Sequence, residues 1–235
     1  MLRYASPVPS PDFQRARSSA AKQVRETAIL GAARVLGADN GIRRVTLSDI
    51  ARAVGMHKSA LLRYFETREQ IFLRLTAEEW RDWSQSVRAE LQRLDHPDSG
   101  QVAAAFARTL AARGMFCDLL AQAPLNLERN VSIDAVRDFK VGTHIEVDAI
   151  VTEVRRLLPL LVEEDVVDLI ATATSLAGAL WQVATPGPEL TALYRSDPRL
   201  RHAIVEFEPR LARILTRMLD GYLAEIGRAS CRERV

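Results

Sequence analysis

Residues 46–65 decide the fold, and they read TLSDIARAVGMHKSALLRYF. The run opens on a capping box, in which the Thr46 hydroxyl can accept a backbone N–H at the start of a helix while Asp49 reaches back to the chain. A helix is therefore predicted from Leu47 to Val54. Gly55 follows where the chain must turn, because glycine adopts the left-handed conformation without a steric penalty.

A second short helix is predicted directly after that turn. Its apolar residues Met56 and Leu61 would face the first helix, whereas Lys58, Ser59 and Arg63 would point outward. A short helix, a tight glycine turn and a second helix with outward polar side chains are typical of a helix-turn-helix, which places its second helix in the major groove of DNA. A helical hairpin formed by packing alone is the alternative interpretation.

The charge of the chain is divided unevenly along its length. Residues 1–68 carry 12 Lys and Arg against 5 Asp and Glu, a net charge of +7, whereas residues 69–235 carry 20 against 25, a net charge of −5. A basic segment on a nearly neutral chain is what a module that binds a polyanion needs. Taken alone, the charge is equally compatible with a solvated charged face.

The rest of the chain also reads as helices. Apolar residues recur at helical spacing at Val24, Ala28, Ala32 and Val35, and no stretch alternates in the manner of a strand. Further helices are predicted at about 67–93, 101–112, 115–122, 131–158, 163–184 and 199–224. The predicted fold class is therefore all-α, with an N-terminal three-helix DNA-binding domain and a C-terminal helical domain for ligand binding and dimerisation.

These patterns divide the chain into segments. Residues 1–17, with three prolines, are predicted to be a flexible basic arm. Residues 18–68 form the predicted helix-turn-helix domain, and residues 69–225 form the predicted ligand-binding and dimerisation domain.

The last ten residues, 226–235, lack an apolar period and become abruptly basic. Their back-translation resembles a common short-read sequencing adapter, and the next triplet of that adapter in this frame is a stop codon. We therefore interpret 226–235 as an artefact of sequence assembly rather than a natural basic tail, and Cys231 takes no part in the functional argument.

Several functional classes find no support in the sequence. Two cysteines are too few for a disulfide framework, so a reducing cytoplasm is expected. The four histidines are scattered without ligand spacing, so neither a metal nor another cofactor is expected. No apolar run approaches the roughly 18 residues that cross a bilayer, so no membrane is expected. No nucleophile elbow, phosphate loop or pair of carboxylates points to an enzyme.

Residues 46–65 resemble the signature of the tetracycline-repressor (TetR) family. The resemblance extends to Thr67-Arg68-Glu69 and Leu73, and to the upstream spacing of Gly41-Ile42 before the capping threonine. Members of that family are dimers whose three N-terminal helices bind double-stranded operator DNA. The resemblance implies a homodimeric repressor that binds a palindromic operator and is released by a small apolar or amphipathic ligand. A ligand-responsive activator and a helical interaction protein without a specific operator are the alternatives.

Chemistry and the resemblance together give the candidate DNA contacts. Lys58 can donate to a guanine edge, and Ser59 can bond a base or a phosphate. Thr46 can offer its hydroxyl and the helix N-terminus to a phosphate, although it caps a helix in any case. The resemblance assigns Tyr64 and Arg68 to the DNA backbone, where the alternatives are a half-buried packing residue and a solvated side chain. The full set is Thr46, Ser48, His57, Lys58, Ser59, Leu62, Arg63, Tyr64 and Arg68.

Three members of this set depart from the usual family pattern. Leu62 stands where tyrosine is common, so it can touch a thymine methyl group but cannot bond a phosphate. Ser48 stands where an arginine often reaches a base, and the losses at Leu62 and Ser48 bear on the affinity and the operator sequence. His57 replaces the commoner serine cap, and it could touch a phosphate or simply end a turn.

The helices predicted at 163–184 and 199–224 correspond to those that form a four-helix bundle across the twofold axis in the family. The first has a small-residue face of Ala171, Thr174, Ser175, Gly178 and Ala179. The second has an apolar stripe of Leu211, Ile214, Leu215, Met218, Leu219 and Tyr222. Intramolecular core is the alternative for both.

A ligand pocket is predicted among large side chains of the C-terminal domain. The candidate ligand-binding residues are Trp83, Phe106, Phe116, Phe139 and His144, with Met115, Val147, Trp181 and Thr143 near them in the pattern. Plain packed core is the alternative for each aromatic residue, because aromatic stripes on helices usually pack.

Overall fold

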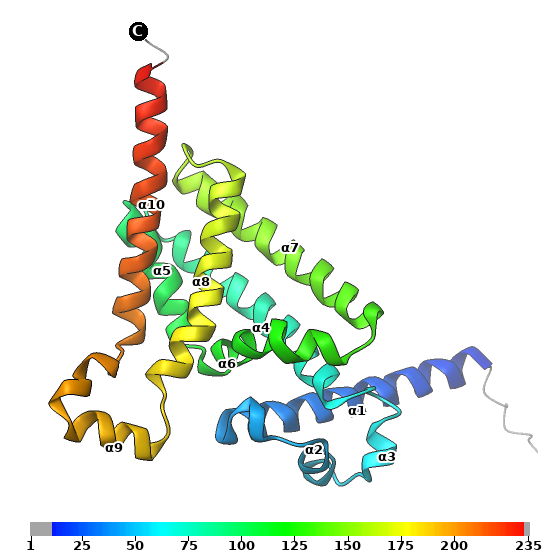
Figure 1. The fold of residues 1–235 in the computed structure, drawn as a ribbon. Helices are drawn as coiled ribbons and strands as arrows, with labels where there is room; N and C mark the ends of the chain where they lie inside the picture. Colours follow the sequence, from blue (N-terminus) through cyan, green and yellow to red (C-terminus); the bar gives the residue numbers. More distant parts are fainter. Residues whose placement is uncertain (1–10, 233–235) are drawn as a thin grey trace, which may run out of the picture.

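The computed structural model describes the backbone of residues 11–232 and the side chains of residues 20–225. The described backbone consists of helices and their connections, with no strand in that part of the chain. The predicted all-α class is therefore confirmed. Figure 1 shows a small N-terminal group of helices at one end of a larger helical bundle.

The N-terminal group contains the predicted helix-turn-helix. Its elements are α1 (Pro11–Asn40), the 3-10 turn η1 (Ile42–Arg44), α2 (Leu47–Ala53) and α3 (Lys58–Leu61). Helix α1 begins at Pro11, inside the segment predicted to be an arm, because proline is tolerated in the first turn of a helix. Residues 11–17 are thus helical, and residues 1–10 lie outside the described residues.

The C-terminal bundle is built from seven helices. They are α4 (Arg68–Leu91), α5 (Ser99–Ala111), α6 (Gly114–Gln122), α7 (Ile133–Leu157), α8 (Glu163–Ala184), α9 (Pro188–Ser196) and α10 (Phe207–Arg232). Short turns η2 (Ala123–Leu127), η3 (Glu128–Asn130) and η4 (Pro198–Ala203) join them. Helix α10 packs against α5 and α8, α6 against α8, and α4 against α7.

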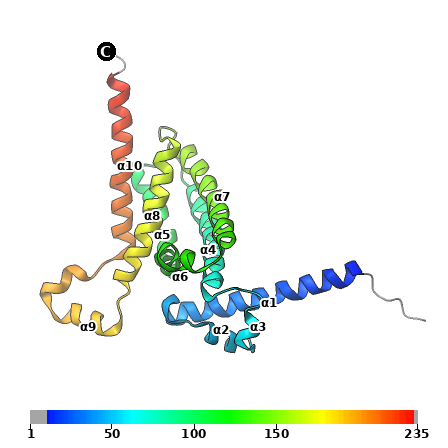
Figure 2. The ribbon, with the colours of Figure 1, turned by 45° about the vertical axis from the view of Figure 1, so that its right-hand side comes forward.

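Helix α9 and the turn η4 form a lobe that projects from the bundle between α8 and α10 (Figures 1 and 2). The single helix predicted at 199–224 is therefore divided into η4 and α10, which are separated by residues 204–206. Helix α10 then continues to Arg232, so the backbone of 226–232 is helical although the apolar pattern stops before it.

Helix α8 is the one described helix that is long and apolar enough, by length and composition alone, to cross a membrane. It contacts α6, α10 and α7, and residues such as Leu169 and Ala173 on its inner face are buried in the core. Core helices commonly meet the same criterion.

Candidate nucleic-acid interface

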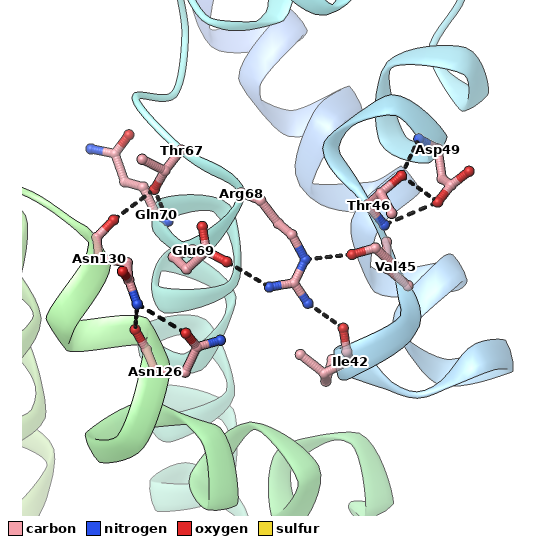
Figure 3. Close-up of polar contacts among 10 residues, drawn as sticks. All are labelled: Ile42, Val45, Thr46, Asp49, Thr67, Arg68, Glu69, Gln70, Asn126 and Asn130. Carbon is pink, nitrogen blue, oxygen red and sulfur yellow. Dashed lines mark hydrogen bonds and ion pairs between the residues drawn. The ribbon is translucent and has the colours of Figure 1, made fainter.

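The capping box at the start of α2 is formed as predicted (Figure 3). The Thr46 hydroxyl oxygen accepts from the Asp49 backbone N–H at 3.2 Å, and Asp49 Oδ2 accepts from the Thr46 backbone N–H at 3.0 Å. The hydrogen bond from the Thr46 hydroxyl, followed by the one from its backbone, holds the pKa of Asp49 below its usual value. The carboxylate is therefore charged at neutral pH, and its hydrogen bonds with Thr46 fix the first turn of α2.

The turn after α2 also matches the prediction, because Gly55 has a φ of 65°, in the left-handed region. Helix α3 then packs through the buried Leu61, with Met56 half-buried beside the core. The polar residues Lys58, Ser59 and Arg63 are exposed. The second helix of the motif thus offers polar side chains to solvent, as a helix that reads DNA must.

The remaining predicted contacts in this region divide by exposure. Thr46, Ser48 and His57 are exposed, and the Leu62 side chain is 44% exposed, which is high for a leucine. Tyr64 is half-buried and lies beside α1 and α4. The first four side chains are exposed enough to contact DNA. The half-buried position of Tyr64 fits the alternative interpretation given above, that of a packing residue.

Arg68 has a different role from the phosphate contact predicted for it (Figure 3). Its guanidinium donates to the carbonyl oxygens of Val45 and Ile42 and forms an ion pair of 2.8 Å with Glu69. It also lies 4.6 Å from the centre of the Phe72 ring, and the side chain is only 14% exposed. Arg68 therefore ties the start of α4 to the segment that precedes α2, because its guanidinium bonds two backbone carbonyl oxygens of that segment.

Asp118 of α6 makes a second tie to the same segment, which the sequence analysis did not single out. It accepts from the Ile42 backbone N–H at 2.8 Å and, through its other oxygen, from the Gln182 side chain at 2.9 Å. The peptide groups of Ile42 are thus bonded on one side by α6 and on the other by Arg68. A lone aspartate on an amphipathic helix carries no local signal of such a partner.

Charged residues join α1 to the bundle as well. Arg34 of α1 pairs with Glu79 and, at 2.8 Å, with Glu78 of α4. Arg113, at the start of α6, lies 3.6 Å from the nearly buried Glu79. Helices α1, α4 and α6 therefore meet at the Glu79 carboxylate. The reading helices, α2 and α3, are thus connected to the C-terminal domain through several charged groups.

Most of the residues predicted to bind a ligand lie in a packed core instead. Trp83, Phe106 and Phe116 are fully buried, and with Trp80 they form an aromatic cluster whose ring centroids lie 5.3–5.9 Å apart. Trp83 donates to the Thr109 hydroxyl at 3.1 Å. Dense edge-to-face packing of this kind stabilises a core and leaves the rings little space to contact a ligand.

The other predicted ligand residues are dispersed. Phe139 is buried and lines a cleft of about 460 Å³ between α1, α4 and α7. The His144 side chain is 75% exposed and lies 3.4 Å from Asp148, so it does not enter the core. Trp181 is half-buried and lines a larger cleft between α8, α9 and the DNA-binding domain. The predicted residues therefore do not form one pocket.

Helices α8 and α10, which the sequence predicts to form the dimer interface, each bury part of the predicted interface against other helices of the same chain. Gly178 of α8 is buried, and a Cβ built on it would lie 2.9 Å from the backbone of Ala121 in α6. On α10, Leu211, Leu215 and Leu219 are fully buried, in a helix that packs against α5 and α8. The leucines of the predicted stripe are thus intramolecular core.

Another part of the small-residue face remains on the surface. Ala171, Ser175 and Ala179 are exposed and follow one another at four-residue spacing along α8. On α10, Ile214 and Met218 are half-buried. An interface between two copies would therefore use the outer side of α8 and not the leucines of α10.

Two family models match this chain. A model described as "Bacterial regulatory proteins, tetR family" matches residues 29–75, and one described as "Tetracyclin repressor-like, C-terminal domain" matches residues 77–226. No curated protein sequence matches at a significant level.

Solved structures show the same fold. A possible TetR family regulator from Streptomyces coelicolor A3(2) is 17% identical, with a TM-score of 0.54 over 85% of this chain and 98% of that one. PfmR from Thermus thermophilus is 15% identical, with a TM-score of 0.53 over 82% and 97%. FadR from the same species, solved with lauroyl-CoA, is 19% identical, with a TM-score of 0.51 over 77% and 95%. Because the two family models together span both domains, this chain belongs to the TetR family of DNA-binding transcriptional regulators.

Proposed function

We propose that this protein is a homodimeric repressor that binds a palindromic operator and is released by a small molecule. The observation that carries the proposal is the exposed polar surface of α3, presented by Lys58 and Ser59 on a segment of net charge +7. The positive charge supplies affinity for phosphates, and the α3 side chains supply contacts to base edges. The protein acts without catalysis and in the cytoplasm, where the DNA is.

The dimer follows from the geometry of DNA reading. One short helix covers only a few base pairs, too few to select a site in a genome. Two copies related by a twofold axis double the contact and require inverted half-sites. The exposed Ala171, Ser175 and Ala179 of α8 allow a close approach of two helices. They support α8 as the centre of the interface.

The release step rests on the charged links between the domains and on a structural relative. Asp118 and Arg68 connect α6 and α4 to the Ile42 peptide, so a ligand that shifts either helix would also shift the reading helices. The similar FadR structure contains lauroyl-CoA, an anionic amphiphile. An amphipathic effector is therefore the class proposed here.

The test is a binding titration of the protein on its own upstream DNA and on a scrambled duplex of equal length. Specific binding should weaken steeply with salt, with a slope of about −0.9 in log K against log salt for each phosphate contacted. Equal affinity for both duplexes at physiological salt would contradict the proposal. Transcription from the same DNA in vitro separates a repressor, which lowers the transcript level, from an activator, which raises it.

A further inference from the structure

A cleft lies between the two domains. It has a volume of about 830 Å³, within the range of small-molecule sites. One wall is the junction of α1 and η1 in the DNA-binding domain, and the other is the end of α8 with the start of the α9 lobe. A molecule bound there would touch both the reading helices and the C-terminal domain.

The wall from the DNA-binding domain is cationic. Arg43 and Arg44 both line the cleft and are exposed, and neither forms an ion pair or a side-chain hydrogen bond within residues 20–225. Asp118 is the one acidic residue that lines the cleft, and each of its oxygens already accepts a hydrogen bond, from Ile42 and from Gln182. With two arginines and one carboxylate, the lining carries a net charge of +1, and neither arginine is paired, which favours an anionic group.

The opposite wall carries aromatic and apolar side chains beside some polar ones. Trp181, Leu190 and Tyr194 line it, and the Leu190 side chain is 47% exposed. The Trp181 ring is held from behind by Phe207, edge to face at 5.7 Å, and by Gly114, where an added Cβ would lie 2.3 Å from the ring. A fixed aromatic surface that faces two arginines matches a molecule with an apolar body and a charged end.

We propose that this interdomain cleft is the effector site and that it binds an anionic amphiphile, meaning an aryl or alkyl group that carries a sulfonate, carboxylate or phosphate. Arg43 and Arg44 hold the anion, and Trp181 with Leu190 covers the apolar part. The inference deepens the proposed release by a small molecule and rests on it for its regulatory meaning. The rings around Trp83 pack on one another, which favours the cleft over the space among those rings as the site.

The smaller cleft between α1, α4 and α7 is a weaker candidate. Two arginines line it: Arg34 is already paired with Glu78 and Glu79, and the exposed Arg74 shares the cleft with two further carboxylates, Glu26 and Asp138. That cleft therefore lacks the separation between a cationic and an apolar wall that the larger one has.

The test uses two fluorescent probes of nearly equal shape on the full chain without DNA. 8-Anilinonaphthalene-1-sulfonate is an anionic amphiphile, and N-phenyl-1-naphthylamine is the same aromatic body without the sulfonate. The double variant Arg43→Gln/Arg44→Gln should raise the Kd of the sulfonate about tenfold, which is about 1.4 kcal/mol, and leave the uncharged probe unchanged. Leu190→Ser should weaken both probes. Arg93→Gln/Arg129→Gln, with the same loss of charge at exposed positions outside the cleft, is the matched control.

Three results would overturn the assignment. They are the absence of saturable binding of the sulfonate, equal sulfonate affinity in the wild type and the Arg43/Arg44 double variant, and equal loss of both probes in that variant. Because these titrations contain no DNA, they test the cleft separately from the proposed function. Failure of the wild type to prefer its upstream DNA would contradict the proposed function while leaving the binding site in place.

Discussion

At the scale of single residues, Lys58 and Arg68 have different roles in the DNA-binding domain: Lys58 is placed to contact DNA, and Arg68 supports the fold. Lys58 is exposed at the start of α3, whereas Arg68 is nearly buried and donates to two carbonyl oxygens of the segment before α2. An exposed lysine is free to reach a base, while a guanidinium that donates from all three of its nitrogens holds the backbone. Removal of the Lys58 side chain should therefore affect DNA binding, whereas removal of the Arg68 side chain should affect stability.

Lys58→Ala should lower discrimination between the operator and scrambled DNA by about 1–3 kcal/mol and leave the melting temperature unchanged. Arg68→Ala should instead destabilise the fold by about 1–3 kcal/mol, because two carbonyl oxygens lose their donors. Thermal melting and paired DNA titrations measure both effects. Arg68→Lys is the control that keeps the charge, and it should also destabilise the fold, since one ammonium group cannot reproduce the planar fork. An unchanged melting temperature in Arg68→Ala would refute its structural role.

Cys117 provides a prediction about reactivity. The side chain is fully buried, and burial raises the pKa of the thiol to about 12. The reactive thiolate is therefore scarce at neutral pH, and reaction with a disulfide reagent should be on the order of a thousandfold slower in the native protein than in the unfolded chain. A Cys231→Ser background isolates the signal. Complete reaction of the native protein within minutes would be incompatible with this burial.

At the scale of elements, α8 and α10 each have an inner face that the chain itself buries. Leu215 on α10 belongs to that core, whereas Ser175 on α8 is on the surface among small residues. A small exposed residue in a helix permits close approach of another helix, and a buried leucine is already committed to packing. Substitutions at the two positions therefore separate association from folding.

Ser175→Arg should convert the proposed dimer to a folded monomer, because a long charged side chain would separate the two α8 helices at the proposed interface. Leu215→Glu should unfold the protein, since an unpaired buried charge costs on the order of 3–5 kcal/mol. Sedimentation at micromolar concentration gives the association state, and circular dichroism gives the helix content. Gln85→Arg, on the exposed side of α4, is the matched control. A dimeric Ser175→Arg variant would exclude α8 as the interface.

At the scale of the whole molecule, the position of the DNA-binding domain depends on contacts with α4 and α6. Asp118→Ala would leave the Ile42 N–H, on a nearly fully buried residue, without its acceptor. The expected cost is about 1–3 kcal/mol, with faster hydrogen exchange at the Ile42 amide. Asp118→Asn retains one acceptor oxygen and should exchange more slowly than Asp118→Ala. Unchanged protection of that amide in Asp118→Ala would show that the link is not formed in solution.

The segment 226–235 should be dispensable for folding and DNA binding. A chain that ends at Glu225 keeps the described contacts of α10 with α5 and α8, because Leu211, Leu215 and Leu219 all precede that point. The melting temperature and operator affinity should therefore match those of the full chain. Sequencing the genomic locus across Ala224 tests the adapter interpretation directly, and a continuous genomic read through Val235 would refute it.

Much of the fold and of the DNA-reading surface is predictable from local sequence. The capping box joins residues three positions apart, and the turn at Gly55 depends on one residue that tolerates a positive φ. The exposed positions of α3 follow from the placement of Leu61 on the opposite side. The helical period and the breaks between helices likewise depend on neighbours within a few residues, so the all-α class needs no tertiary information.

Only the tertiary structure decided which of several local possibilities each side chain took. Arg68 and Asp118 acquire their roles at the Ile42 peptide, and Asp118 lies 76 positions from Ile42 in the chain. The aromatic residues around Trp83 look equally suitable for a pocket or a core until their rings meet edge to face. The sequence by itself thus determined the helices, the reading motif and the family. Contacts between distant segments determined burial, partners and clefts, because helical periodicity marks a face as apolar without stating what will cover it.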